Sequence, residues 1–403
     1  MRAKDKNTTT TKCALKREKE LTLFSLAFML FFAIMVVSCN NSSNNPDKST
    51  NQSANEQTSL GNSSVDSVAS DSALYKDSNE AITSAATKYK ELKIKKIESQ
   101  TSLTSQDFKS SKRKAVLIGV GYYSKRKDWN EDTGWSDINS LNDIALLQEH
   151  LIALDFKVIN ITDEHATHAG IINALNALAA KDCCHPGDTI FIHFSGHGQP
   201  MLDIVGDESD NMTETFIPFD ALKRATKEYD MAQNHLKDDE IYEYIVRITN
   251  KIGTNGVLLV SLDACHSGGG TLAETRVDEN RIIRSSGDTF HSDRLDDLAK
   301  LYDNSKAKKP KYISHFYAIS ACKSDESNYE YIDKAGVLGV NGRHYGSLSF
   351  VLCRELAHLK KGERIDFEKL TNAIIHHKEN NINFWQKLGQ TPVKETNESD
   401  NLY

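Results

Sequence analysis

The stretch "SLDACHSGGG", Ser261–Gly270, places a cysteine where an apolar run gives way to glycines. An earlier apolar run ends in "HFSGHG", which places His197 between two glycines. A cysteine and a histidine form the simplest activated nucleophile, because the imidazole can take the thiol proton and later give one to a leaving amine. Either residue alone would be interpreted as a buried structural side chain. Together, at the ends of consecutive predicted strands, Cys265 and His197 predict an activated nucleophile and its base.

Side-chain direction identifies which histidine can serve Cys265. Successive side chains on a strand point to opposite faces, so His266 should diverge from Cys265, while Asp263 shares the face of Cys265. By the same parity, Ser195 shares a face with His197. We therefore expect His197, and not His266, to act as the base.

The elements that must position these residues alternate between strand-like and helix-like patterns. We expect strands within 114–123, 156–163, 188–198, 255–265 and 315–322, and helices within 138–154, 166–181, 238–252, 346–359 and 366–380. Such alternation favours an α/β fold with a mainly parallel sheet covered by helices on both faces. Ligands of such sheets bind beyond the carboxyl ends of the strands, where both motifs lie.

The motifs "HFSGHG" and "DACHSG" resemble, in order and spacing, the histidine and cysteine motifs of the metacaspases, within the caspase family of cysteine peptidases. The resemblance covers about residues 112–395, which we expect to form the catalytic domain. It implies a caspase-like three-layer α/β/α sandwich, with Cys265 as nucleophile and His197 as base and acid. It also implies an oxyanion hole made by the backbone N–H groups of Gly198 and Cys265.

The same resemblance implies an acidic pocket that accepts arginine or lysine before the cut bond. Its residues match Asp143 in "LNDIALL", Ser195 and Asp263. Carboxylates beneath the nucleophile would hold a cationic side chain through charge-assisted hydrogen bonds. Asp143 could instead cap or decorate a helix, and Asp263 could bond a neighbouring backbone N–H.

Many metacaspases bind calcium, and one acidic pair of their site matches Asp238 and Asp239 in "LKDDEIYEY". Carboxylate oxygens suit calcium. The acidic residue that the family can carry after the cysteine is replaced here by "GGGTLAE". The pair could equally stabilise the start of a helix. We therefore expect no required cofactor and leave calcium as an option.

The segment "TLAETRVDENRIIRSSGDTFHSDRLDDLAK" follows the cysteine strand and is mostly polar. Such a connection is expected to be an exposed loop of the kind that proteases cut. Arg281 and Arg284 would suit an acidic pocket, so we predict self-cleavage after one of them. The alternative is that these arginines balance nearby acidic residues on a solvated loop.

The N-terminus has the layout of a secretory signal, with basic residues before the apolar run "LTLFSLAFMLFFAIMVV". "VVSC" resembles the bacterial lipobox, so we predict a signal peptide over 1–39 with Cys39 lipidated. An uncleaved membrane anchor is the alternative, because the run is close to the length that spans a bilayer. Either would tether the chain to a membrane, with its C-terminal part on the periplasmic or cell-surface side.

Composition completes the expected organisation. Residues 40–111 are rich in Ser, Asn and Thr and predict a disordered stalk, and 396–403 form a short tail. The net charge of -7 argues against nucleic acid as a partner. We expect a membrane-tethered cysteine endopeptidase that cuts protein or peptide substrates after Arg or Lys. The alternative function is a catalytically weak caspase-fold module for binding or signalling.

Overall fold

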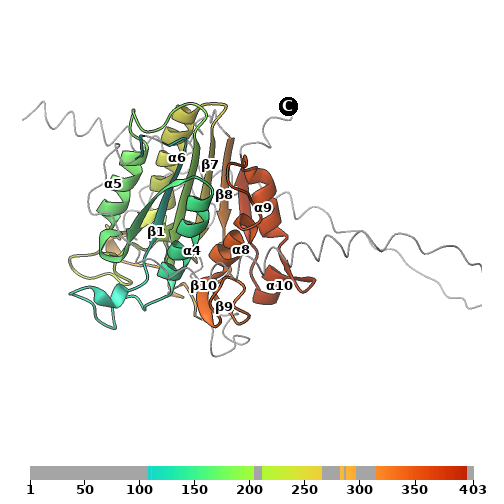
Figure 1. The fold of residues 1–403 in the computed structure, drawn as a ribbon. Helices are drawn as coiled ribbons and strands as arrows, with labels where there is room; N and C mark the ends of the chain where they lie inside the picture. Colours follow the sequence, from blue (N-terminus) through green and yellow to red (C-terminus); the bar gives the residue numbers. More distant parts are fainter. Residues whose placement is uncertain are drawn as a thin grey trace, which may run out of the picture.

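The computed structural model describes residues 108–109, 111–203, 211–265, 282–285, 287–295 and 315–396. The central strands are β1 (Arg113–Gly119), β2 (Lys157–Thr162), β3 (Thr189–Ser195), β7 (Val257–Asp263), β8 (His315–Ser320) and β13 (Val393–Thr396). They form one six-stranded sheet in the order β13, β8, β7, β3, β1, β2 (Figure 1). β13 pairs antiparallel with β8, and the other neighbours pair parallel.

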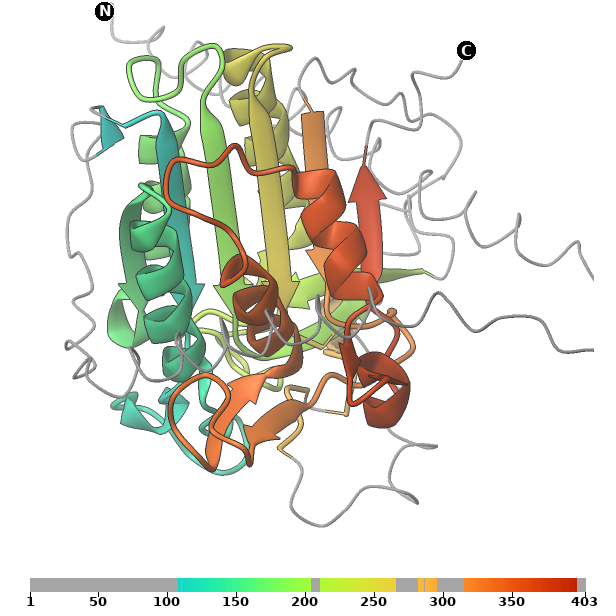
Figure 2. The same ribbon diagram turned by 45° about the vertical axis from the view of Figure 1, so that its right-hand side comes forward.

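Helices cover both faces of this sheet (Figure 2). The helices are α4 (Ser140–Ala153), α5 (His168–Leu178), α6 (Asp238–Ile252), α8 (Ser347–Leu356) and α9 (Phe367–Ile375). Side chains of α5 and α6 share one apolar core with one face of the sheet, and those of α4, α8 and α9 share a second core with the other face. The predicted three-layer α/β/α sandwich with a mainly parallel sheet is confirmed.

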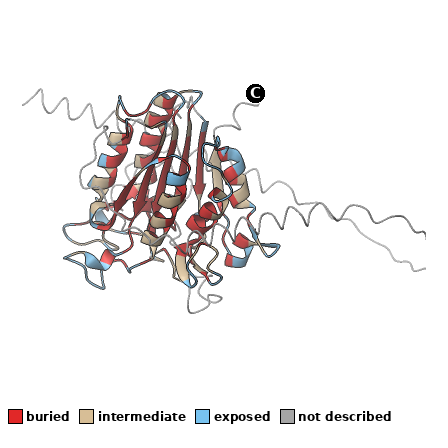
Figure 3. Ribbon diagram, viewed as in Figure 1, coloured by how far each residue is buried: buried red, intermediate tan, exposed pale blue. Residues whose placement is uncertain are grey.

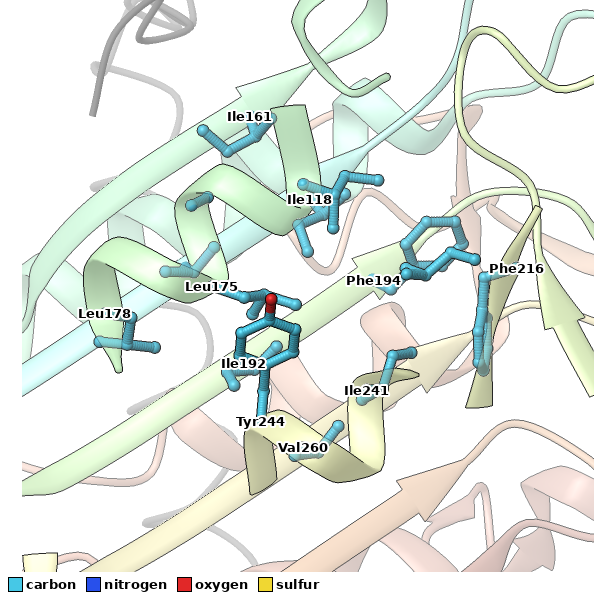
Figure 4. Packing of buried hydrophobic residues seen from close by; sticks show 14 of the residues in the cluster. Ile118, Ile161, Leu175, Leu178, Ile192, Phe194, Phe216, Ile241, Tyr244 and Val260 are labelled. Carbon is cyan, nitrogen blue, oxygen red and sulfur yellow. The ribbon is translucent and has the colours of Figure 1, made fainter. Parts of the chain in front are cut away.

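The two cores explain why the central strands are apolar along nearly their whole length. In β3, Ile192 and Phe194 pack with Leu175 of α5 and Tyr244 of α6 (Figure 4). Phe191, of opposite parity, lies in the second core. The strands in the middle of the sheet are therefore buried on both sides (Figure 3), as parallel strands between two helix layers must be.

Short strands surround the carboxyl ends of β3 and β7. These are β4 (Gly198–Leu202), β5 (Met212–Phe216), β6 (Leu236–Lys237), β9 (Glu330–Asp333) and β10 (Arg343–Gly346). Further along the chain lie β11 (Lys378–Glu379), β12 (Ile382–Asn383) and α10 (Phe384–Leu388). β4, β5 and β6 form one small sheet, and β9 and β10 form another. The sequence patterns predicted none of these short elements.

The N-terminal predictions fall outside the described residues. They include the signal segment, Cys39 and nearly all of the stalk. Within the described part of the chain, no helix is long and apolar enough to cross a bilayer.

Candidate active site

The histidine and cysteine motifs meet at one edge of the sheet. β3 and β7 are neighbours, and their last residues, Ser195 and Asp263, are paired in register. His197 and Cys265 each follow two residues later. Gly198 packs against the backbone of Cys265 so closely that a Cβ on Gly198 would lie 1.8 Å from the Cys265 carbonyl oxygen. A glycine is therefore required where the two motifs touch.

The ring of His197 has one nitrogen engaged and one free. Nε2 donates to the carbonyl oxygen of Ser136 at 2.9 Å, whereas the buried Nδ1 has no hydrogen-bond partner among the described residues. Burial lowers the pKa of His197 to about 4, so the ring is neutral near pH 7. The bond to Ser136 assigns the proton to Nε2 and leaves a lone pair on Nδ1. His197 thus has the tautomer of a general base.

The thiol of Cys265 is buried among backbone groups that follow β8. The N–H of Asn328 donates to Sγ at 3.3 Å, and the thiol donates to the carbonyl oxygen of Glu326 at 3.5 Å. The side chain of Asn328 also donates to Asp263 at 2.7 Å. The loop between β8 and β9 therefore links Cys265 to Asp263, the acidic residue two positions before it.

The three predicted pocket residues lie together beneath Cys265. Asp143 comes from the first turn of α4, and its Oδ2 accepts from the hydroxyl of Ser195 at 2.7 Å. Asp263 accepts from the backbone N–H and the hydroxyl of Ser349 on α8, at 2.7 and 2.6 Å. Asp143, Ser195 and Asp263 are all fully buried. The structure thus brings together residues from α4, β3 and β7.

This pocket holds the side chain of Arg284. Nη2 lies 2.7 Å from Asp143 Oδ2, and Nη1 lies 2.7 Å from Ser195 Oγ and 3.7 Å from Asp263 Oδ1. The exposed fraction of Arg284 is 0%. The expectation that Arg284 lies on an exposed loop is therefore wrong, because the carboxylates of the pocket compensate its charge away from water. Arg281 lies outside the described residues.

A third carboxylate, which the sequence analysis missed, completes the pocket. Glu330 at the start of β9 approaches Arg284 Nη2 at 3.3 Å, and the backbone N–H and side-chain amide of Asn139 orient it, each at 2.7 Å. Gly346 forms another wall, and a Cβ there would lie 2.2 Å from Asp263 Oδ2. Glu330 and Gly346 lie far from the two motifs in sequence, and no motif or pattern marks either of them.

The pKa of Asp143 and that of Arg284 depend on each other's charge. Burial raises the pKa of Asp143 to about 7, the charges of Asp263 and Glu330 act in the same direction, and Arg284 opposes them. Burial disfavours the charge of Arg284, but the three carboxylates outweigh it and raise the pKa of the guanidinium. The guanidinium therefore stays charged between these carboxylates, and Asp143 would be more costly to ionise without it.

Hydrogen bonds hold the backbone of Arg284 on both sides. The carbonyl oxygen of Arg284 accepts from the N–H of Gly198 at 3.1 Å, and its N–H donates to the carbonyl of Asn328 at 3.1 Å. The N–H of Glu330 donates to the carbonyl of Ile282 at 2.9 Å, and Ile283 forms an antiparallel bridge with Tyr329. The predicted oxyanion-hole donor Gly198 thus already binds a peptide carbonyl.

The predicted calcium pair, Asp238 and Asp239, lies in the first turn of α6. Acidic side chains there interact favourably with the helix dipole. No group of three His, Cys, Asp or Glu residues within the described ranges could hold a metal ion. Calcium binding at this pair therefore remains an untested option.

Comparisons with known proteins agree with this arrangement. Residues 113–272 match the family model "Metacaspase, peptidase C14 domain". Metacaspase-1 of Eremothecium gossypii is 31% identical over 167 residues, which are 39% of this chain and 32% of that protein. Metacaspase-1 of Ajellomyces capsulatus is 32% identical over 170 residues, 40% of this chain and 41% of that protein. The chain thus spans less than half the length of these relatives.

Two solved structures overlay more loosely. A protein of Geobacter sulfurreducens aligns with a TM-score of 0.43 and 20% identity, over 70% of this chain and 93% of that chain. The Drosophila initiator caspase Dronc aligns with a TM-score of 0.36 and 10% identity, over 75% of this chain and 87% of that chain. By the family match and the metacaspase relatives, residues 113–272, which hold both motifs, are similar to the peptidase domain of metacaspases, in the caspase family of cysteine peptidases.

Proposed function

We propose that the chain hydrolyses peptide bonds after arginine or lysine, with Cys265 as nucleophile and His197 as general base and acid. The observation that carries this proposal is the fully buried guanidinium among Asp143, Asp263 and Glu330, next to a peptide carbonyl bound by Gly198. The same contacts that hold Arg284 would hold an arginine of another polypeptide.

The reaction follows from the groups present. Nδ1 of His197 takes the thiol proton, and the sulfur of Cys265 attacks the carbonyl carbon of the residue in the pocket. The N–H of Gly198, together with that of Cys265, stabilises the negative oxygen that forms. The protonated imidazole then gives its proton to the leaving amine, and a thioester remains on Cys265. Water hydrolyses the thioester to a carboxylate and restores the thiol.

The pocket selects by charge. A cationic side chain meets three carboxylates, and a guanidinium can bond two of them and Ser195 at once. A lysine ammonium has one nitrogen and would satisfy fewer of these groups. An acidic side chain would add a like charge to a buried acidic pocket, which costs several kcal/mol. We expect cleavage after arginine to be fastest and cleavage after aspartate to be absent.

Membrane tethering belongs to the same proposal and depends on the sequence alone. The basic N-terminus, the apolar run and "VVSC" favour a lipid on Cys39 and a peptidase domain outside the cytoplasm. The polar segment 40–111 would then separate the catalytic domain from the bilayer.

A set of matched peptides tests the proposed specificity. For peptides that differ only in the residue before the cut bond, kcat/KM should decrease in the order Arg, Lys, citrulline, and the Asp peptide should not be cleaved. Citrulline keeps the shape of arginine without its charge. We expect Arg to exceed citrulline by at least about 100-fold, since charge-assisted bonds to the pocket contribute ~3 kcal/mol. Cleavage after Asp, or equal rates for Arg and citrulline, would refute the acidic-pocket assignment.

A further inference from the structure

Cys322 lies at the end of the strand next to the one that carries Cys265. β7 and β8 are parallel neighbours, and the last residues paired between them are Leu262 and Ser320 (Figure 1). Cys265 comes two residues after the end of β7, and Cys322 comes two residues after the end of β8. Neighbouring strands lie about 4.8 Å apart, and the Cα atoms of a disulfide lie about 4.4–6.8 Å apart. The two strand ends therefore have the spacing that a disulfide requires.

The two thiols share one hydrogen-bond acceptor. Sγ of Cys265 and Sγ of Cys322 both donate to the carbonyl oxygen of Glu326, at 3.5 and 3.3 Å. The two sulfur atoms therefore cannot lie further apart than these two distances combined. The pKa of Cys322 is raised first by its hydrogen bond with Cys265 and then by burial. The two sulfur atoms thus lie within reach of each other in the folded chain, where both cysteines are thiols.

Further hydrogen bonds hold the turn that carries the shared acceptor. The carboxylate of Glu326 accepts from the backbone N–H and the hydroxyl of Thr391, at 2.6 and 2.7 Å. The N–H of Glu326 donates to the carbonyl oxygen of Lys323 at 3.1 Å. The side-chain amide of Gln390 donates to the carbonyl oxygen of Ala321 at 3.4 Å. These bonds keep the Glu326 carbonyl oxygen at the position where both thiols reach it.

Cys322 differs in its surroundings from the other buried cysteines of the described residues. Cys183 and Cys184 belong to the apolar core on one face of the sheet, and Cys353 belongs to the core on the other face. Cys322 is also buried, but it belongs to neither of these two cores. A buried cysteine usually serves as a small apolar side chain within a core. That packing role does not account for a thiol that lies beside the nucleophile and bonds to the same carbonyl group.

The two thiols differ in how readily they lose a proton. In the proposed mechanism, His197 takes the proton of Cys265, and the buried Nδ1 of His197 has no hydrogen-bond partner among the described residues. The pKa of Cys322 is raised, so this thiol keeps its proton. Peroxides react with thiolates far faster than with thiols. Peroxide should therefore oxidise Cys265 first, and Cys322 is placed to attack the product.

We propose that Cys322 is a resolving cysteine, which closes a reversible disulfide with Cys265 after a peroxide has oxidised Cys265. The disulfide switches the peptidase off and protects its nucleophile. This inference rests on the proposed function, because it concerns the regulation of the same nucleophile.

The proposed reaction has two steps. The sulfur of Cys265 attacks one oxygen of hydrogen peroxide, the O–O bond breaks, and water leaves, so that Cys265 becomes a sulfenic acid. The sulfur of Cys322 then attacks the sulfenic sulfur, the S–O bond breaks, and the proton of Cys322 leaves with the hydroxide as a second water. The two thiols lose two electrons in total, and one peroxide accepts them.

The test uses the reduced full-length chain in mild detergent, freed of reductant and then exposed to excess hydrogen peroxide. In wild type, hydrolysis of an arginyl peptide should fall at least about 10-fold and return to nearly its starting rate with dithiothreitol. A non-reducing peptide map should join Cys265 to Cys322 before the reductant is added and not after it. In Cys322→Ser, dithiothreitol should restore less than about a tenth of the variant's own starting activity, because the sulfenic acid proceeds to higher oxides.

A matched variant and a chemical trap serve as controls. Cys353→Ala removes another buried thiol, that of α8, and it should lose and regain activity as wild type does. Dimedone, which traps sulfenic acids, should label Cys265 at least about 10-fold more in Cys322→Ser than in wild type. The label and the peptide map are read by mass spectrometry, so neither depends on peptidase activity.

The outcomes separate this inference from the proposed function. Full recovery of Cys322→Ser, or no joined peptide in peroxide-inactivated wild type, would overturn the resolving role of Cys322 and leave the peptidase assignment standing. The map may instead join the two cysteines while neither reduced wild type nor Arg284→Ala, both with the native circular dichroism spectrum, hydrolyses the arginyl peptide. In that case the proposed function fails and the disulfide stands.

Discussion

Replacing Arg284 by alanine should destabilise the uncut chain, because it leaves three buried carboxylates without their cation. The perturbation is made in the Cys265→Ala background, where the 284–285 bond stays intact. Arg284 contacts Asp143, Asp263 and Glu330 from a fully buried position. Removing one partner of a buried ion pair costs about 3–5 kcal/mol, which we expect as the loss in free energy of unfolding at pH 8. For a domain of this size, the loss corresponds to a Tm lower by about 6–20 °C.

The loss in free energy of unfolding caused by Arg284→Ala should grow as pH rises. Burial raises the pKa of Asp143 to about 7 from its ordinary value near 4, so ionising this carboxyl costs folding free energy as pH rises between these values. Removing the cation enlarges that cost. The difference in free energy of unfolding between the Cys265→Ala chain and the same chain with Arg284→Ala should therefore grow from pH 5 to pH 8.

Thermal unfolding of the two variants measures the effect, with Arg294→Ala in the same background as control. Arg294 belongs to the same connection, but its side chain is 64% exposed and meets only Asp230 at 3.4 Å among the described residues. Its loss should change stability by less than about 1 kcal/mol. Agmatine, a small guanidinium, should restore about 2.7 kcal/mol to the Arg284→Ala variant at 100 times its Kd. Equal Tm values for both arginine variants, or no response to agmatine, would refute the buried acidic pocket.

Three further predictions follow from the same geometry. The kcat/KM for an arginyl peptide should fall below pH 7 through a rise in KM, because Asp143 loses its charge there. His197, with a pKa of about 4, stays neutral in this range, so kcat should change little. The pH profiles of kcat and KM check this. Gly346→Ala should slow cleavage after arginine by about 100-fold, because a Cβ would lie 2.6 Å from Nη1 of the bound arginine; kinetics against a citrulline peptide serve as control. A lipid precursor should label the wild-type chain in cells but not Cys39→Ser, and equal labelling would favour the uncleaved anchor.

The sequence was informative where one residue pattern extends over a whole element. The amphipathic run at 238–252 predicted α6 with the bounds that the structure has, and the buried strands β3 and β7 followed from long apolar runs. Strand parity predicted that Asp263 shares the face of Cys265 and Ser195 the face of His197, and in the structure α8 and α4 contact these two side chains. These features depend on periodicity and burial, which a sequence records directly.

The rest of the site depends on contacts between distant residues. β9 and β10 have four residues each, and their pairing is set by packing next to the pocket more than by local pattern. Arg284 stands in a polar stretch, where arginine is normally solvated. Its burial is explained by Asp143, Asp263 and Glu330, which surround its guanidinium in the folded chain. These carboxylates are distant in sequence, so the local stretch does not predict the burial.

The most direct test of the central claim is to map the residue that an arginyl electrophile modifies. A tripeptide ending in an arginyl acyloxymethyl ketone is incubated with the Arg284→Ala chain, in which the pocket is free of its own arginine, and the adduct is located by mass spectrometry. We predict one adduct, on Cys265, formed at least about 100-fold faster than with the citrulline reagent. An adduct on another cysteine, or equal rates for the two reagents, would contradict an arginine-selecting site built around Cys265.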